Sequence, residues 1–252
     1  MLLTRYDMEN RTGDEAEDWH SDAFRLFDEK MSDPIHKFPC IPATIGHKLG
    51  HLRYGFLEDP KEVASASKLA ALLEQYGAES RAFGSYTSLI AIFKTPADLV
   101  RTHAVDDYRL LFWELLSKVH AYDVKEWPSD IPTDPDHHVW EYCFGGEKYF
   151  MYCATPAHHS RVSRSFPYFL FAITPRWVLD RFNANPKTAA SIKRQIRDRI
   201  VDYDGLGIHP DLNQYGSEHN FEWKQYFLGD DSKSAAEAGL KCPFAHLHSP
   251  KK

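Results

Sequence analysis

The pattern of apolar and polar positions predicts a chain that mixes helices and short strands. Apolar residues recur at helical spacing between Asp14 and Met31 after an acidic first turn, which predicts an amphipathic helix over residues 14–31. Later β-rich runs predict strands, and longer runs with a helical apolar stripe predict helices. In chain order we expect a strand over 51–56, a helix over 60–76 ending at Gly77, a strand over 86–93, helices over 96–100 and 106–119, a hairpin of 139–144 and 148–154, a strand over 166–173, and helices from 175, over 187–203 and over 222–227.

Glycine and proline positions refine this pattern. Two prolines within Phe38–Ala43 remove amide donors, so we expect a rigid extended loop that presents Cys40. Gly145-Gly146 indicates a tight turn inside the hairpin. No repeat or low-complexity linker divides the chain. We therefore expect one α+β domain over residues 1–252, a mainly antiparallel sheet flanked by helices, with a loop-rich tail from about residue 205.

Composition narrows the classes of function. The 252 residues are 43% hydrophobic and 14% aromatic, which is enough for a substantial core. A net charge of −6 argues against a nucleic-acid partner, since phosphate binding needs excess Lys and Arg. The sequence contains no run of about 18 apolar residues, so it predicts no membrane span. The acidic N-terminus lacks a secretory signal, so we expect a cytoplasmic protein. The four cysteines have no CxxC spacing, which disfavours a zinc ribbon. The sequence is also compatible with a homodimer.

The segment 149–177 carries the main candidate chemistry, because two apolar runs enclose an insert with His158, His159, Arg161 and Arg164. An iron porphyrin needs an axial ligand, cations for its propionates and an apolar pocket. Adjacent histidines on an extended chain point to opposite sides, so at most one of the two reaches a given centre. The same features also fit an arginine-rich surface turn between core strands. Candidate aromatic walls are Phe150, Tyr152, Phe166, Tyr168, Phe169 and Phe171.

Other residues offer alternatives. Cys40 is a rival axial ligand, because a thiolate favours oxygen activation at haem iron. Arg176 joins Arg161 and Arg164 as a candidate partner of the propionates. Glu141 and Glu222 are candidates for gripping a cationic substrate. The chain lacks GxSxG, P-loop, GxGxxG and HExxH motifs. The sequence therefore gives no support for the hydrolases, NTPases, Rossmann enzymes and zincins that carry these motifs.

Five motifs in order along the chain resemble the YqcI/YcgG-like family. They are FPCIPA at 38–43, LRYGF at 52–56, the segment 142–177, EWKQYFLGDD at 222–231 and CPF at 242–244. The family's characterised members are haem-dependent N-hydroxylases that act on the guanidine group of arginine or arginine-derived amino acids. The resemblance maps the family's histidine to His158, with His159 as the alternative, and its Phe-Pro-Cys element to Cys40. It also maps a Ser-Arg and a Pro-Arg element to Arg164 and Arg176.

The resemblance implies non-covalent haem b, since no CxxCH is present, with His158 as the proximal ligand and His159 or Cys40 as alternatives. The implied partners are a guanidino amino acid, dioxygen or peroxide, and an external electron donor. Glu141 and Glu222 are the carboxylates expected to hold the guanidinium. Three other hypotheses stay open at this point: a haem-binding or haem-sensing protein without turnover, a non-haem interaction domain, and a metal hydrolase using His137, His138 and His158.

Overall fold

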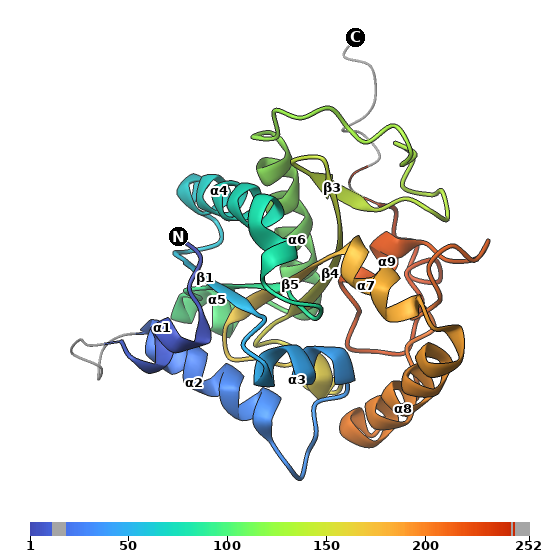
Figure 1. The fold of residues 1–252 in the computed structure, drawn as a ribbon, viewed down its shortest axis with the longest axis horizontal. Helices are drawn as coiled ribbons and strands as arrows, with labels where there is room; N and C mark the ends of the chain where they lie inside the picture. The colour runs from blue at the N-terminus through green and yellow to red at the C-terminus, as the bar shows by residue number, and fades with distance from the viewer. Residues whose placement is uncertain (12–18, 243, 245–252) are drawn as a thin grey trace.

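The computed structural model of the chain describes residues 1–11, 19–242 and 244, and a five-stranded sheet lies at its centre (Figure 1). The strand order is β1-β2-β5-β4-β3. Only β1 and β2 run parallel, joined by a helical crossover, and the other three pairings are antiparallel. The predicted α+β class with a mainly antiparallel sheet is confirmed. The strands are β1 (Arg53–Leu57), β2 (Leu89–Phe93), β3 (Tyr142–Phe144), β4 (Glu147–Ala154) and β5 (Phe169–Pro175).

Helices cover the two faces of this sheet. Side chains alternate between the faces along each strand, so Leu89, Ala91 and Phe93 enter one core while Ile90 and Ile92 enter the other. The larger core packs against α4 (Val63–Glu79), α6 (Val105–His120) and α9 (Glu222–Tyr226). The smaller core packs against α2 (Trp19–Ser32) and the segment leading into α3 (Ile41–Lys48). The sheet therefore separates two apolar layers of unequal size.

The remaining helices lie at the margins. Among them, α8 stands at the edge of the molecule beside α7 (Figure 1). Only Ala189 and Asp204 are buried along its 19 residues, so α8 is held at few points. These marginal elements are α1 (Arg5–Glu9), η1 (Ser80–Ala82), α5 (Ala97–Thr102), η2 (Val162–Arg164), α7 (Arg176–Asn183) and α8 (Pro186–Asp204).

Most predicted elements are present with shifted ends. The hairpin turn at Gly145-Gly146 is confirmed, with φ values of 62° and 79° that favour glycine. The extended loop over Phe38–Ala43 is wrong in its second half, because α3 begins at Ile41. Pro42 lies in the first turn of α3, where a missing N–H removes no hydrogen bond.

The predicted stop at Gly77 is also wrong, since α4 continues to Glu79. A Cβ at Gly77 would lie 2.9 Å from the Tyr149 hydroxyl, so glycine here makes room for a close approach between helix and sheet. The first helix is confirmed from Trp19 onward. Its predicted beginning over 14–18, and Pro243 of the CPF motif, lie outside the described residues.

Candidate functional site

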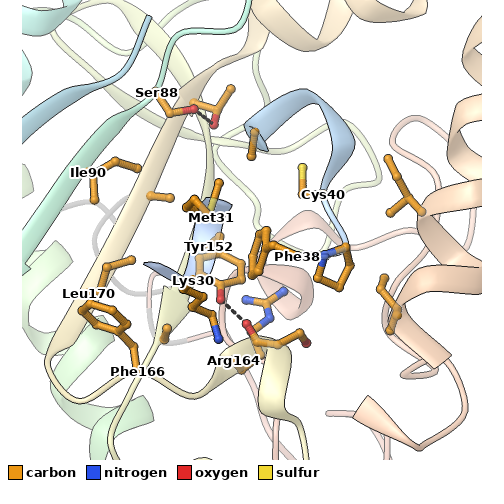
Figure 2. Close-up of a pocket in the computed structure, with 18 of the residues that line it drawn as sticks. Lys30, Met31, Phe38, Cys40, Ser88, Ile90, Tyr152, Arg164, Phe166 and Leu170 are labelled. Atoms are coloured by element: carbon orange, nitrogen blue, oxygen red, sulfur yellow. Dashed lines mark hydrogen bonds between the residues drawn. The ribbon is translucent and has the colours of Figure 1, made fainter. Parts of the chain in front are cut away.

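A cavity of about 290 Å³ lies on the smaller-core face of the sheet. This volume is near the lower end of the roughly 300–1,000 Å³ typical of small-molecule pockets. Its walls come from α2, the loop before α3, strands β2, β4 and β5, η2 and the inner side of α8. Its lining includes Lys30, Phe38, Cys40, Ser88, Ile90, Phe150, Tyr152, Ala154, Arg161, Ser163, Arg164, Phe166, Leu170, Ala172, Ile196, Ile200 and Asp204. Figure 2 shows part of this lining.

Strand alternation decides which predicted aromatic walls reach the cavity. Phe150 and Tyr152 on β4 point into it, and Phe166 joins them from the chain before β5. Phe169 and Phe171 point through the sheet into the larger core, so their predicted role as cavity walls is wrong. Side chains alternate between the two faces along β5, so Phe169 and Phe171 both face the side of the sheet opposite the cavity.

Cys40 enters the cavity from the N-terminus of α3. It is the residue before the first helical turn, and its carbonyl accepts the first helical hydrogen bond from the Thr44 amide (3.1 Å). The side chain is only partly buried because the cavity reaches it. Burial raises the pKa of the Cys40 thiol, while the nearby Ala43 amide and Arg164 oppose that rise. Cys40 is therefore a protonated thiol next to groups that favour a thiolate.

Three cations surround the cavity near η2. Lys30 of α2 donates to the carbonyl groups of Val162 and Ser165, both at 3.0 Å. Burial lowers the pKa of Lys30 to about 8, with Asp204 opposing. The guanidinium of Arg164 stacks on the ring of Tyr152, at 4.3 Å from its centroid. These contacts place positive charge against an apolar wall.

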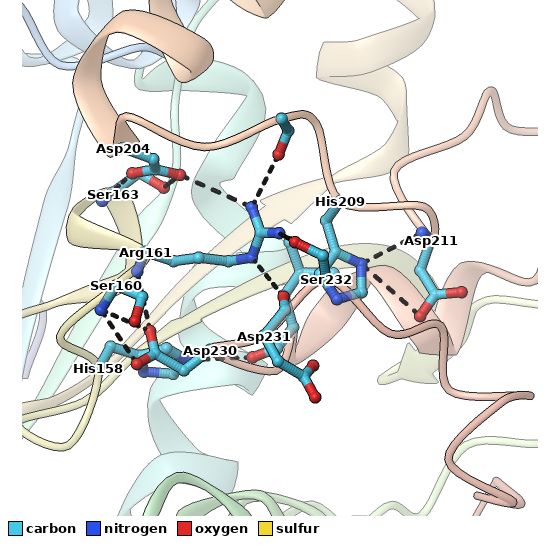
Figure 3. Close-up of polar contacts among 12 residues, drawn as sticks. His158, Ser160, Arg161, Ser163, Asp204, His209, Asp211, Asp230, Asp231 and Ser232 are labelled. Carbon is cyan, nitrogen blue, oxygen red and sulfur yellow. Dashed lines mark hydrogen bonds and ion pairs between the residues drawn. The ribbon is translucent and has the colours of Figure 1, made fainter.

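Both arginines of the insert are already held by protein oxygen atoms. Arg164 donates to the carbonyl groups of Cys153, Tyr226 and Gln225, each at 3.3 Å. Arg161 is buried and donates to the carbonyl groups of Asp231 and Gly207 and to the Ser232 hydroxyl, at 3.0, 3.3 and 3.3 Å (Figure 3). They supply charge near the cavity, and they also fasten the C-terminal loops to the sheet.

A buried carboxylate, Asp204, links α8 to the same turn. It accepts hydrogen bonds from the Ser163 amide (2.6 Å) and the Ser163 hydroxyl (2.9 Å), and Arg161 lies 4.0 Å away. Of the carboxylates in the part of the chain that the structure describes, Asp204 alone lines this cavity. The C-terminal end of α8 is thereby fixed to the cavity floor.

His158 and His159 lie elsewhere. His158 is buried, and its Nδ1 and Nε2 are 2.8 Å from the Thr155 hydroxyl and 3.0 Å from the Leu228 carbonyl. Burial lowers the pKa of His158 to about 4, so the ring is neutral near pH 7. The exposed His159 lines a separate pocket of about 700 Å³ beside α6, and its amide donates to Asp230. Neither imidazole reaches the cavity that contains Cys40.

Glu141 and Glu222 are brought together, but around a guanidinium of the chain itself. Arg176 donates to Glu141 (2.5 Å) and Glu222 (2.6 Å), and its guanidinium lies 3.8 Å from the ring centroid of Tyr215. Burial raises the pKa of Glu141 to about 7, although Arg176 and Tyr215 oppose the rise. Burial also acts to lower the pKa of Arg176, but the two carboxylates outweigh it and raise that pKa. This buried triad joins the residue before β3 to the first residues of α7 and α9.

The histidines proposed for a metal hydrolase are not gathered. The rings of His137 and His138 stack on each other with centroids 4.5 Å apart, and both ring nitrogens of His158 are engaged elsewhere. Across residues 1–11, 19–242 and 244 there is no group of three or more His, Cys, Asp or Glu side chains arranged to hold a metal ion. Within the same residues, no helix has the length and apolar character needed to cross a membrane.

Lys30 and Asp204 were not identified as site residues from the sequence. Each sits in a helix whose polar residues resemble an ordinary solvated face. Lys30 meets η2 across more than 130 residues of chain, and Asp204 meets it across 41. The one signal that could have found Asp204 is its position at the end of a cationic helix, next to Gly205.

The comparisons with known proteins decide the family. The model of the YqcI/YcgG family matches residues 27–245. This chain belongs to the YqcI/YcgG family. YcgG of Bacillus subtilis (strain 168) is 45% identical over 237 residues, 94% of this chain and 92% of the relative. YqcI of the same strain is 45% identical over 229 residues, 91% of this chain and 89% of the relative.

A more distant relative has a name that states an activity. The Streptomyces lavendulae protein named "Putative N(omega)-hydroxy-L-arginine synthase DcsA" is 30% identical over 241 residues, 94% of this chain and 88% of the relative. No solved structure gives a significant match to the chain. For this member of the YqcI/YcgG family, the cavity around Cys40 is the candidate functional site.

Proposed function

We propose that this chain N-hydroxylates a guanidine group of arginine or of an arginine-derived amino acid, with haem b as its cofactor. Membership of the YqcI/YcgG family and the name of the relative DcsA support the reaction. The observation that carries the proposal is the cavity, in which the Cys40 thiol faces apolar walls flanked by Lys30, Arg161 and Arg164.

The donor set of the cavity fits a haem whose iron is bound by Cys40. Thiolate is an established protein ligand of haem iron, and the Cys40 side chain lines the cavity. No described histidine lines it, and His158 has hydrogen-bond partners at both ring nitrogens. Cys40, placed before His158, is therefore the residue that would bind the iron. Lys30, Arg161 and Arg164 are the cations available for the propionates.

The surroundings of Cys40 would control its binding to iron. In the free protein, burial raises the pKa of the thiol, so ligation requires loss of a proton. The N-terminus of α3 and the charge of Arg164 both favour the resulting thiolate. Haem binding should therefore strengthen as pH rises.

The remaining lining would bind and orient the substrate. A guanidinium needs a carboxylate partner, and Glu141 and Glu222 already hold Arg176. Asp204 has lone pairs beyond those that Ser163 uses, so it is our candidate partner for the substrate guanidinium. Apolar residues such as Phe38 and Ile196 would exclude water. Bound haem would supply the activation of dioxygen or peroxide for transfer of one oxygen atom to a guanidine nitrogen.

A porphyrin and an amino acid together need more room than the cavity has in the free chain. The wall formed by α8 is the one most able to yield, because only Ala189 and Asp204 are buried along it. The sheet and α2, by contrast, are packed into the smaller core. We expect ligand binding to displace α8 outward about its fixed end at Asp204.

Absorption spectra of protein expressed with added haem test the cofactor and its ligand. We expect a haem band in the wild type that is lost or strongly altered in Cys40→Ser and retained in His158→Gln. His159→Ala serves as the matched control, because that side chain is exposed and outside the cavity. A band unchanged in Cys40→Ser and abolished in folded His158→Gln would refute the ligand assignment.

Mass spectrometry tests the reaction. Arginine incubated with the haem-loaded protein, dioxygen and a reductant should gain one oxygen atom, and Asp204→Asn should raise KM more than it lowers kcat. Protein that shows the haem band but leaves a panel of guanidino compounds unmodified would be a haem-binding protein without turnover. A colourless protein would indicate that no haem binds and would favour the interaction-domain hypothesis.

A further inference from the structure

The cavity wall formed by α8 is joined to the rest of the chain mainly at its two ends. The N-terminus of α8 follows α7 after only two residues. At the C-terminus, Asp204 accepts hydrogen bonds from the amide and hydroxyl of Ser163. Between these ends, over residues 187–203, the described part of the chain shows one side-chain hydrogen bond to another element. In that bond Arg197 donates to the Leu212 carbonyl at 2.9 Å, and we call this contact the Arg197 clasp.

The Arg197 clasp lies where two walls of the cavity meet. Ile196, next to Arg197 in the chain, lines the cavity from α8 together with Ile200. Leu212 lines the same cavity from the loop 209–213. The clasp therefore bridges a seam between α8 and this loop. The Arg197 side chain is exposed, so water can compete for its hydrogen bond, which is typical of segments that open locally.

The loop side of the seam is fixed. The buried carboxylate of Asp211 accepts a hydrogen bond from the Ala235 amide at 2.8 Å. The amide of Asp211 donates to Nδ1 of His209 at 3.2 Å (Figure 3), and the Leu212 amide donates to the His209 carbonyl at 3.0 Å. Since α8 stands at the edge of the molecule beside α7 (Figure 1), α8 is the side that can move.

We propose that the seam between α8 and the loop 209–213 is the entrance to the cavity, and that the Arg197 clasp controls it. With the clasp broken, α8 keeps its attachments at both ends and can turn outward about Asp204. The sheet and α2 are packed into the smaller core and form the walls that stay in place. This inference rests on the proposed function for the identity of the molecules that enter, haem and a guanidino amino acid.

The test uses Cys40 of the haem-free, full-length protein as a reporter of the entrance. Cys40 lines the cavity (Figure 2), whereas Cys143 and Cys153 are buried and do not line it. The protein is labelled with N-ethylmaleimide at one fixed pH, and peptide mass spectrometry gives the labelling rate of each cysteine. Opening of the seam exposes Cys40 alone, whereas global unfolding exposes all three thiols.

Three variants separate the clasp from a general effect on α8. Arg197→Met removes the donor and keeps an apolar side chain, so labelling of Cys40 should become roughly fivefold faster, which corresponds to the loss of one hydrogen bond. Arg197→Lys keeps a donor and should label at a rate close to wild type. Arg194→Met is the matched control, because Arg194 is an exposed cation of the same helix with no hydrogen bond or ion pair among the described residues.

Two results would overturn the inference. One is labelling of Cys40 at the same rate in Arg197→Met as in the wild type or in Arg194→Met. The other is a parallel acceleration at Cys143 and Cys153, because the label would then reach Cys40 through global unfolding.

Haem uptake separates this inference from the proposed function. When haem is added, its absorption band should develop faster with Arg197→Met than with the wild type. If no protein binds haem but labelling of Cys40 follows the expected order, the entrance stands and the proposed cofactor fails. If haem binds while the labelling rate of Cys40 is the same in all four proteins, the entrance is wrong and the proposed function stands.

Discussion

Replacing Arg176 with methionine should destabilise the protein by an amount that depends on pH. Arg176 holds two buried carboxylates, Glu141 at 2.5 Å and Glu222 at 2.6 Å. Removing one member of a buried ion pair costs about 3–5 kcal/mol, because the other charge remains buried without its partner. Glu222 keeps the side-chain amides of Asn220 and Gln225, at 2.9 and 3.1 Å. We therefore expect a loss near the lower limit, ~3 kcal/mol of unfolding free energy at pH 8.

The pH dependence follows from Glu141. Its pKa is already raised to about 7 by burial, and loss of Arg176 raises it further. The folded variant then keeps a proton that the unfolded chain, with an ordinary glutamate pKa, has released. Stability falls with rising pH wherever the folded state binds more protons. Above pH 7 the wild type has released this proton, so the gap between variant and wild type should widen by up to about 1.4 kcal/mol per pH unit.

Urea unfolding followed by tryptophan fluorescence at pH 6.5 and 8.5 measures both quantities. Arg181→Met is the matched control, because it removes an exposed cation from the same helix and should change stability by less than about 0.5 kcal/mol. A loss below about 1 kcal/mol at both pH values, or a loss that is the same at both, would refute this account of the triad.

Two further predictions concern His158 and Gly84. The pKa of His158 is lowered to about 4 in the folded chain. Between about pH 6.5 and 4 the unfolded chain therefore binds a proton on this ring, whereas the folded chain does not. Stability should fall between pH 6.5 and 4 by up to ~3 kcal/mol from this group, and His158→Gln should flatten that acid limb in urea titrations. Gly84 has φ +114°, and a Cβ there would lie 2.4 Å from the His51 ring. Gly84→Ala should therefore lower the melting temperature more than Gly145→Ala, which has φ +62° and open space around it; equal shifts would contradict the steric argument.

Local patterns predicted the order and type of most elements, though not the helices α1 and α3, because such patterns depend on neighbouring residues. The apolar stripe of Ile192, Ile196 and Ile200 identified α8, and Gly145-Gly146 identified the hairpin turn. The errors arose where a local rule has two outcomes. A proline can end a helix or occupy its first turn, as Pro42 does, and a glycine can end a helix or relieve a close contact, as Gly77 does.

The candidate site was predicted only in part. The motif containing Cys40 and the insert containing Arg161 and Arg164 meet at one cavity. His158, from the same insert, turns to the Leu228 carbonyl instead. The sequence could not distinguish these orientations, because the insert is irregular and has no fixed side-chain period.

The sequence by itself therefore determined the fold class, the family and the segments from which a site could be built. Tertiary structure decided which side chains meet, because those contacts depend on strand order and on the stacking of helices across the sheet. Glu141 and Glu222 were expected to bind a guanidinium, and they do bind one, but it belongs to Arg176. The residue type alone shows that a glutamate can bind a guanidinium. Which guanidinium it binds depends on the fold, because Glu141 and Glu222 lie 35 and 46 residues from Arg176 in the chain.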